Sequence, residues 1–163
     1  MGKICLNFLS TRLLSFNIKF MELALEQAQK AFNLDEVPVG AVIVHKGRVI
    51  GKGFNEVIKK NSVIYHAEIN AIIEASRSLD NYRLNNCEIY VTLEPCHMCA
   101  KAIVDARIEC LFYGASESKT GAVQSIDKFL TKSQLNHKVR YSGGYLQEES
   151  IKLLRDFFAS KRN

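Results

Sequence analysis

Two short stretches decide the fold and the chemistry: Tyr65-His66-Ala67-Glu68 and Pro95-Cys96-His97-Met98-Cys99. They read H-x-E and P-C-x-x-C, and the first cysteine follows the histidine by 30 residues. One imidazole and two thiolates hold a zinc ion and leave its fourth tetrahedral position for a water. A nearby carboxylate can then move protons to and from that water. We therefore predict one Zn²⁺ per subunit on His66, Cys96 and Cys99, with Glu68 as the catalytic residue.

Both stretches fall where a helix is expected to begin. Pro95 suits a first helical turn, because a residue there needs no amide donor. Cysteines three positions apart project to the same side of a helix, and its N-terminus favours thiolates. Residues two apart on a regular helix point nearly opposite ways, so His66 and Glu68 can share a metal only at the helix end.

Other readings of these residues exist. A C-x-x-C pair alone is typical of a redox centre or of structural zinc, but structural sites usually add a second such pair or two histidines, and none is present. His45 and His137 are alternatives for closing the site, although neither has ligand-like spacing. His97, between the cysteines, is expected to point away from them. The complete pattern favours an open catalytic zinc site.

The rest of the chain alternates between helical and strand-like periodicity. A hairpin with a tight Lys46-Gly47 turn is expected early, and residues 57–65 and most of 115–137 read as irregular. The expected helices are 18–32, 66–78, one starting at Pro95, and 146–161; the expected strands are 39–45, 48–54, 88–93, 108–113 and 139–141. This order predicts an α/β sandwich with a mixed sheet.

Composition bounds the remaining possibilities. The 163 residues suit one domain, and a net charge of +5 fits either a phosphate-bearing partner or simple solubility. Five cysteines, an odd number, suit a reducing, cytoplasmic setting. No run approaches the ~18 apolar residues that span a bilayer, so no membrane partner is expected. We divide the chain into an extension of unknown role, residues 1–17, and a domain of residues 18–163. An organelle transit peptide and a non-native extension ahead of Met21 are the two alternatives for the first part.

Beyond the metal motif, residues 18–161 resemble the bacterial tRNA-specific adenosine deaminases, members of the cytidine and deoxycytidylate deaminase superfamily. The stretches that carry the resemblance are Glu36-Val37-Pro38-Val39-Gly40-Ala41, Gly53-Phe54-Asn55, His66-Ala67-Glu68-Ile69, Tyr90-Val91-Thr92-Leu93-Glu94-Pro95-Cys96-His97-Met98-Cys99-Ala100, Lys119-Thr120-Gly121-Ala122 and Leu135-Asn136-His137. Their conjunction is far more specific than any one of them.

The resemblance implies a cytidine-deaminase-like three-layer α/β/α sandwich with about five strands, working as a homodimer. It also implies hydrolytic deamination of the wobble adenosine of a tRNA anticodon stem-loop to inosine. Asn55 would then hydrogen-bond the flipped base, and Val37, Ala67 and Leu93 would wall the pocket. Without the resemblance, a turn residue at the end of a strand is the alternative interpretation of Asn55, and Val37 and Leu93 could equally be plain core.

Two departures and a set of basic residues complete the comparison with that family. Glu117 stands where members often have Asp, in a loop expected near the nucleotide backbone, and Ser150 stands where they often have Cys. In the family, late basic residues help to grip the stem-loop; here these are Lys119, Lys138, Arg140, Arg155, Lys161 and Arg162. A solvated face is the alternative reading of Lys161 and Arg162.

Two other functions fit the zinc motif. One is a deaminase of a free nucleobase or nucleotide such as cytosine, guanine or dCMP, which would not need basic residues in its last helix. The other is a non-catalytic RNA-binding subunit, which would be expected to lose its proton-transfer residue, whereas Glu68 is intact.

Overall fold

Side chains alternate along strand β3 (Cys87–Leu93) and divide the core into two halves. In the computed structural model, which describes residues 15–162, Ile89 and Val91 belong to one buried cluster and Tyr90 belongs to the other. All three side chains are fully buried. A strand that is apolar on both faces must be covered on both sides, so a three-layer arrangement follows.

Five strands form one mixed sheet in the order β2-β1-β3-β4-β5. β1 (Gly40–His45) pairs antiparallel with β2 (Arg48–Phe54) and with β3, and Lys46 and Gly47 form the turn of the hairpin. β3, β4 (Cys110–Ala115) and β5 (Arg140–Gly143) run parallel. The predicted mixed five-stranded sheet is confirmed.

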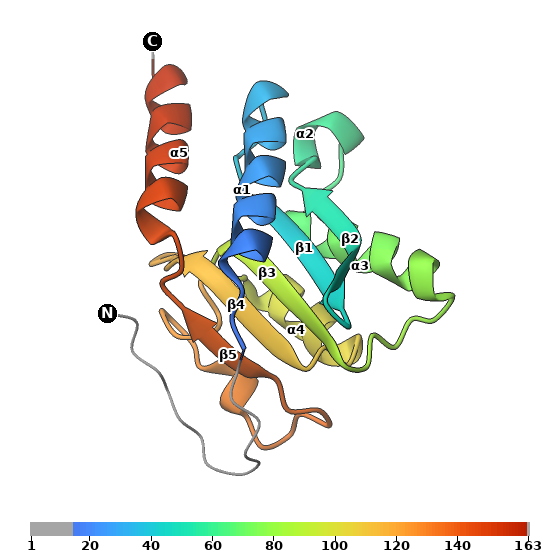
Figure 1. Cartoon of the computed structure of the whole chain (residues 1–163). Helices are drawn as coiled ribbons and strands as arrows, with labels where there is room; N and C mark the ends of the chain where they lie inside the picture. Colours follow the sequence, from blue (N-terminus) through green and yellow to red (C-terminus); the bar gives the residue numbers. More distant parts are fainter. Residues whose placement is uncertain (1–14, 163) are drawn as a thin grey trace.

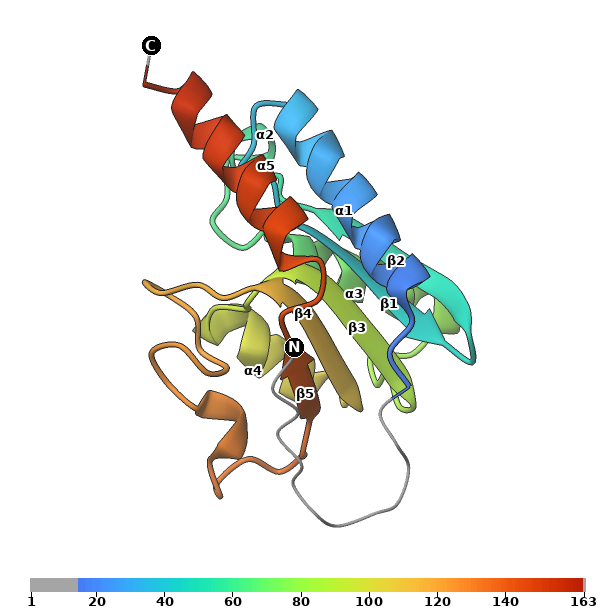
Figure 2. The same cartoon turned by 60° about the vertical axis from the view of Figure 1, so that its left-hand side comes forward.

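Helices cover both faces of this sheet (Figures 1 and 2). α1 (Ile18–Asn33) and α5 (Gln147–Ser160) lie side by side on one face. α3 (Ala67–Leu79) and α4 (His97–Asp105) lie on the other. The predicted three-layer α/β/α sandwich is therefore confirmed. No helix within residues 15–162 combines the length and the apolar character that crossing a bilayer requires.

The contact between β2 and α3 is unusually close, and it fixes where α3 begins. Gly53 faces the first turns of α3, where a Cβ would lie 2.5 Å from the backbone nitrogen of Ala71. The absent side chain lets the helix backbone rest directly on the strand. The side chain of Asn70 adds a hydrogen bond of 2.8 Å from its amide nitrogen to the carbonyl oxygen of Phe54.

Two local predictions need correction. Residues 57–65 contain a one-turn helix, α2 (Val57–Lys60), because the distant carboxylate of Glu36 accepts hydrogen bonds from two of its backbone amides. α4 begins at His97 instead of Pro95, with Cys96 as its N-cap residue. Residues 115–137, mostly irregular as predicted, contain a short 3-10 helix, η1 (Phe129–Thr131).

The structure also shows the burial of the cysteines outside the metal motif and of two phenylalanines in the last helix. Cys87 and Cys110 are buried, whereas Cys5 lies outside the described residues, as do residues 1–14 of the predicted extension. Phe157 packs into the core against Phe32, and Phe158 is 45% exposed.

Candidate active site

The predicted ligands come from the starts of two helices. His66 is the N-cap residue of α3 and Cys96 that of α4, while Cys99 lies in the first turn of α4. An N-cap residue has extended backbone, and His66 has φ −72° and ψ 157°. His66 and Glu68 therefore do not follow helical spacing, which resolves how two residues so close in sequence can serve one site.

The three ligand atoms have the spacing of a zinc site. His66 Nδ1 lies 3.6 Å from Cys96 Sγ and 3.5 Å from Cys99 Sγ, and all three atoms lie within 4.8 Å of one another. Zinc bonds of about 2.3 Å to sulfur and about 2.05 Å to nitrogen, at tetrahedral angles, place nitrogen and sulfur about 3.6 Å apart. The residues present therefore fit a zinc ion.

Within the described residues, no fourth protein ligand joins His66, Cys96 and Cys99. Among residues 15–162, His66, Cys96 and Cys99 form the one group of His, Cys, Asp or Glu side chains close enough to share a metal ion. Glu68 lies outside this group. His137 bonds the carbonyl oxygen of Ile108 at 2.7 Å, and His97 turns away to Asp127 at 2.9 Å, as expected. The site is thus open rather than structural.

The thiol pair shares its protons unequally. A hydrogen bond from the Cys99 thiol lowers the pKa of Cys96 to about 4, and the His66 ring acts in the same direction. The same bond and burial raise the pKa of Cys99. Its hydrogen bond to Cys96 raises the pKa of His66. A preformed thiolate at a helix start is a ready ligand for a cation.

Glu68 is a buried carboxylate beside these ligands. It is 4% exposed, and burial raises its pKa to about 6, against hydrogen bonds from its own backbone amide and from the Cys99 thiol. A carboxyl group with a pKa near neutrality is suited both to accept and to donate protons.

A pocket of about 320 Å³ opens over two of the ligands, His66 and Cys96, and over Glu68. Such a volume lies within the ~300–1,000 Å³ range of small-molecule sites. Its lining includes every residue predicted to contact the base: Val37, Asn55, Ala67 and Leu93. Asn55 is 7% exposed, and its backbone amide bonds the carbonyl oxygen of Val39 at 3.1 Å. The structure brings the predicted residues together, while their roles toward substrate stay a prediction.

Sequence reasoning gave no role to several other residues of this pocket. Val39, Val57, Ile58 and Thr120 line it, together with two buried acids, Glu36 and Glu94. Glu36 accepts hydrogen bonds from the amides of Ile58 and Lys59 at 3.1 and 2.6 Å, and so holds α2 at the pocket wall. Both acids belong to stretches that carry the family resemblance. For Glu94, an acid directly after an apolar strand is the signal in the sequence that points to a buried carboxylate.

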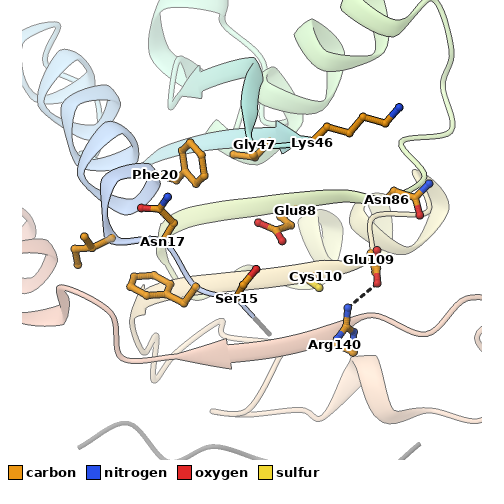
Figure 3. A pocket seen from close by; sticks show the side chains of 13 residues that line it. Ser15, Asn17, Phe20, Lys46, Gly47, Asn86, Glu88, Glu109, Cys110 and Arg140 are labelled. Carbon is orange, nitrogen blue, oxygen red and sulfur yellow. Dashed lines mark hydrogen bonds and ion pairs between the residues drawn. The ribbon is translucent and has the colours of Figure 1, made fainter. Parts of the chain in front are cut away.

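A second hollow, of about 880 Å³, lies at the other end of the sheet (Figure 3). Glu88, Glu109 and Arg140 line it, and Arg140 forms an ion pair of 2.6 Å with Glu109. None of its lining residues belongs to the His66, Cys96 and Cys99 group. The smaller pocket is therefore the one with catalytic chemistry. Arg140, predicted to help grip RNA, lies at the opposite end of the parallel strands from it.

The fold and this site define a zinc-dependent deaminase of the cytidine deaminase type. Residues 14–115 match the family model described as the cytidine and deoxycytidylate deaminase zinc-binding region. The tRNA-specific adenosine deaminase of Rickettsia bellii is 46% identical over 145 residues, which are 88% of this chain and 100% of that protein. The chain belongs to the tRNA-specific adenosine deaminases.

Solved structures agree with this assignment. One, from a study of A-to-I editing by tRNA:A34 deaminases at the wobble position of transfer RNA, is 45% identical with a TM-score of 0.82. The match covers 85% of this chain and 100% of that one. The guanine deaminase of Bacillus subtilis is 30% identical with a TM-score of 0.61, over 91% of this chain and 96% of that one.

Loss of one ligand is expected to abolish stoichiometric zinc binding. Cys99→Ala removes one of three protein ligands, whereas Cys110→Ala removes a buried thiol that belongs to no metal group. Atomic emission spectroscopy of the purified proteins should find one zinc per chain in the Cys110→Ala variant and little in the Cys99→Ala variant. Full zinc content in both would contradict the assignment of ligands.

Proposed function

We propose that this protein deaminates the wobble adenosine of a tRNA anticodon to inosine. One observation carries the proposal: a buried carboxylate, Glu68, stands beside an open His66, Cys96, Cys99 site in a chain that belongs to the tRNA-specific adenosine deaminases. The pocket of about 320 Å³ suits one flipped base and excludes a paired duplex. Residues 18–163 form the deaminase domain in this proposal.

The chain's own residues orient the base and move the protons. A bound zinc ion lowers the pKa of a water and so supplies the nucleophile for C6 of adenine. Glu68 takes a proton from that water and donates it to ring nitrogen N1. It then takes the proton of the new hydroxyl group at C6 and delivers it to the departing amino group. Water and adenosine thus become inosine and ammonia. The buried position of Glu68 keeps these protons from bulk solvent.

Pocket walls provide the specificity in this proposal. The amide of Asn55 both donates to and accepts from a base edge, and Val37, Ala67 and Leu93 supply apolar surface for its faces. Basic residues around the last helix and loops add contacts to phosphates. Lys161 has an additional partner, since it forms an ion pair with Asp35 at the end of α1.

Activity and its dependence on Glu68 are tested together. Wild-type protein incubated with a tRNA anticodon stem-loop carrying A34 should form inosine, measured by mass spectrometry of the digested RNA. Glu68→Gln keeps the size of the side chain but cannot accept the proton, so kcat should fall by about 10²–10⁴ with zinc content unchanged.

Parallel assays on guanine, cytosine and dCMP address the alternative. The guanine deaminase likeness is the observation that favours a free-base substrate. Turnover of one of these compounds without inosine in the stem-loop would replace the proposed function. Zinc binding without turnover of any substrate would instead indicate a non-catalytic RNA-binding subunit.

Asn55 is expected to act on substrate recognition. Asn55→Ala removes both hydrogen-bonding atoms from the pocket, so kcat/KM on the stem-loop should fall by about tenfold or more. Asn33→Ala, at the exposed end of α1, is the matched control and should keep wild-type kinetics. Equal kinetics for the two variants would remove Asn55 from the recognition set.

We propose that the chain works as a cytoplasmic homodimer. Exposed apolar side chains near the pocket support a second copy: Ile58 is 71% exposed, Val63 75% and Ile64 47%. Sedimentation equilibrium should give twice the chain mass of 18.4 kDa, and the mass of one chain would refute the dimer.

The free thiols of the four cysteines among the described residues fit a reducing compartment that also holds tRNA.

A further inference from the structure

We infer that Glu94 is a positioning residue for the substrate: its carboxylate holds the loop of residues 117–125 at the wall of the metal-bearing pocket. The inference deepens the proposed function and rests on it. Glu94 follows directly after β3, is 2% exposed and stands two residues before the ligand Cys96. Both the loop and the metal site are therefore tied to one short segment of backbone.

Both carboxylate oxygens of Glu94 are occupied by the loop. Oε1 accepts hydrogen bonds from three successive backbone amides, those of Val123, Gln124 and Ser125, at 3.1, 2.7 and 2.9 Å. Oε2 accepts from the amide of Glu117 at 3.0 Å and from the hydroxyl of Ser125. Buried backbone amides need an acceptor, and a carboxylate is a strong one.

The chain approaches this carboxylate so closely that one position excludes a side chain. A Cβ at Gly121 would lie 2.5 Å from Oε2 of Glu94. The next amide, that of Ala122, donates to the carbonyl oxygen of Pro95 at 2.9 Å. The loop thus surrounds the carboxylate of Glu94, and it also contacts Pro95, the residue between Glu94 and the ligand Cys96.

The loop has no other regular structure to fix its shape. Residues 116–128 contain neither helix nor strand, although Ala122 and Val123 are buried. Thr120 nevertheless lines the pocket together with Leu93, Glu94 and Cys96. Because the five donors on Glu94 all belong to this loop, loss of the acceptor acts on the pocket wall rather than on α4.

The test replaces Glu94 by Gln and uses Glu88→Gln as the matched control. Glu88 lies on the same central strand but at its other end, where it accepts a hydrogen bond of 3.0 Å from the Tyr90 hydroxyl. Three measurements are made on each full-length protein: zinc content, hydrogen–deuterium exchange of the segment 117–125, and steady-state deamination of an anticodon stem-loop carrying A34.

Glu94→Gln replaces one acceptor oxygen with an amide N–H₂ group, which faces N–H donors. The loop therefore loses the hydrogen bonds that this oxygen accepted. We expect faster exchange in residues 117–125, a KM raised by about tenfold or more, kcat within about threefold of wild type, and full zinc content. Glu88→Gln should match the wild type in all three measurements.

Other outcomes overturn the inference. Loss of zinc with a fall in kcat would make Glu94 a support for the metal centre, and unchanged exchange with unchanged KM would leave it no positioning role. Hydrogen–deuterium exchange is measured without substrate. If residues 117–125 exchange as slowly in Glu94→Gln as in the wild type, Glu94 does not hold the loop, even where the wild type forms no inosine. Absent inosine with fast exchange instead refutes the proposed function and, with it, the substrate role.

A second variant covers the case in which Glu94→Gln does not fold. Gly121→Ala forces the loop away from the carboxylate without removing an acceptor. It should raise KM and speed exchange in the same segment while zinc content stays full. Wild-type KM in Gly121→Ala would count against the inference in the same way.

Discussion

The structure depends on one geometric constraint: a nitrogen and two sulfur atoms, from helices that begin about thirty residues apart in sequence, must meet at the distances of a single metal ion. Two features meet this constraint. α3 and α4 lie on the same face of the sheet, and each begins with a capping residue that is also a ligand. The extended backbone of a cap turns the side chain toward the helix axis, where the partial positive charge of the N-terminus also favours thiolates.

Buried acids organise the surroundings of this centre in three different ways. Glu68 lies buried beside the ligand group, Glu36 accepts hydrogen bonds from the amides of the short helix α2, and Glu94 accepts those of a loop. Each would be costly to bury alone, and each lies where hydrogen-bond donors converge on it. The pocket therefore owes its shape to polar contacts as much as to apolar packing, which suits a site that must recognise a polar base.

The sequence predicted the mixed sheet and the ligand group, because these follow from periodicity and from short motifs whose spacing is local. The three layers were implied by the family resemblance. It missed α2, since the acceptor that stabilises this turn, Glu36, lies more than twenty residues earlier. The function of Glu94 was hidden for the same reason: its partners lie 23 to 31 residues later, in a loop without periodicity. Contacts of this kind depend on how the chain folds back, and no local pattern records them.

The absence of a side chain at Gly53 has a consequence for how the enzyme can change over time. Because strand and helix touch through their main chains there, the start of α3, and with it the histidine ligand, is positioned by contact between two backbones and not by side-chain packing. Neighbouring apolar residues can be exchanged for others of similar volume and the metal ligand keeps its place. Sequence change in the surrounding core therefore does not move the metal ligand. Position 53, where β2 contacts α3, accepts only glycine.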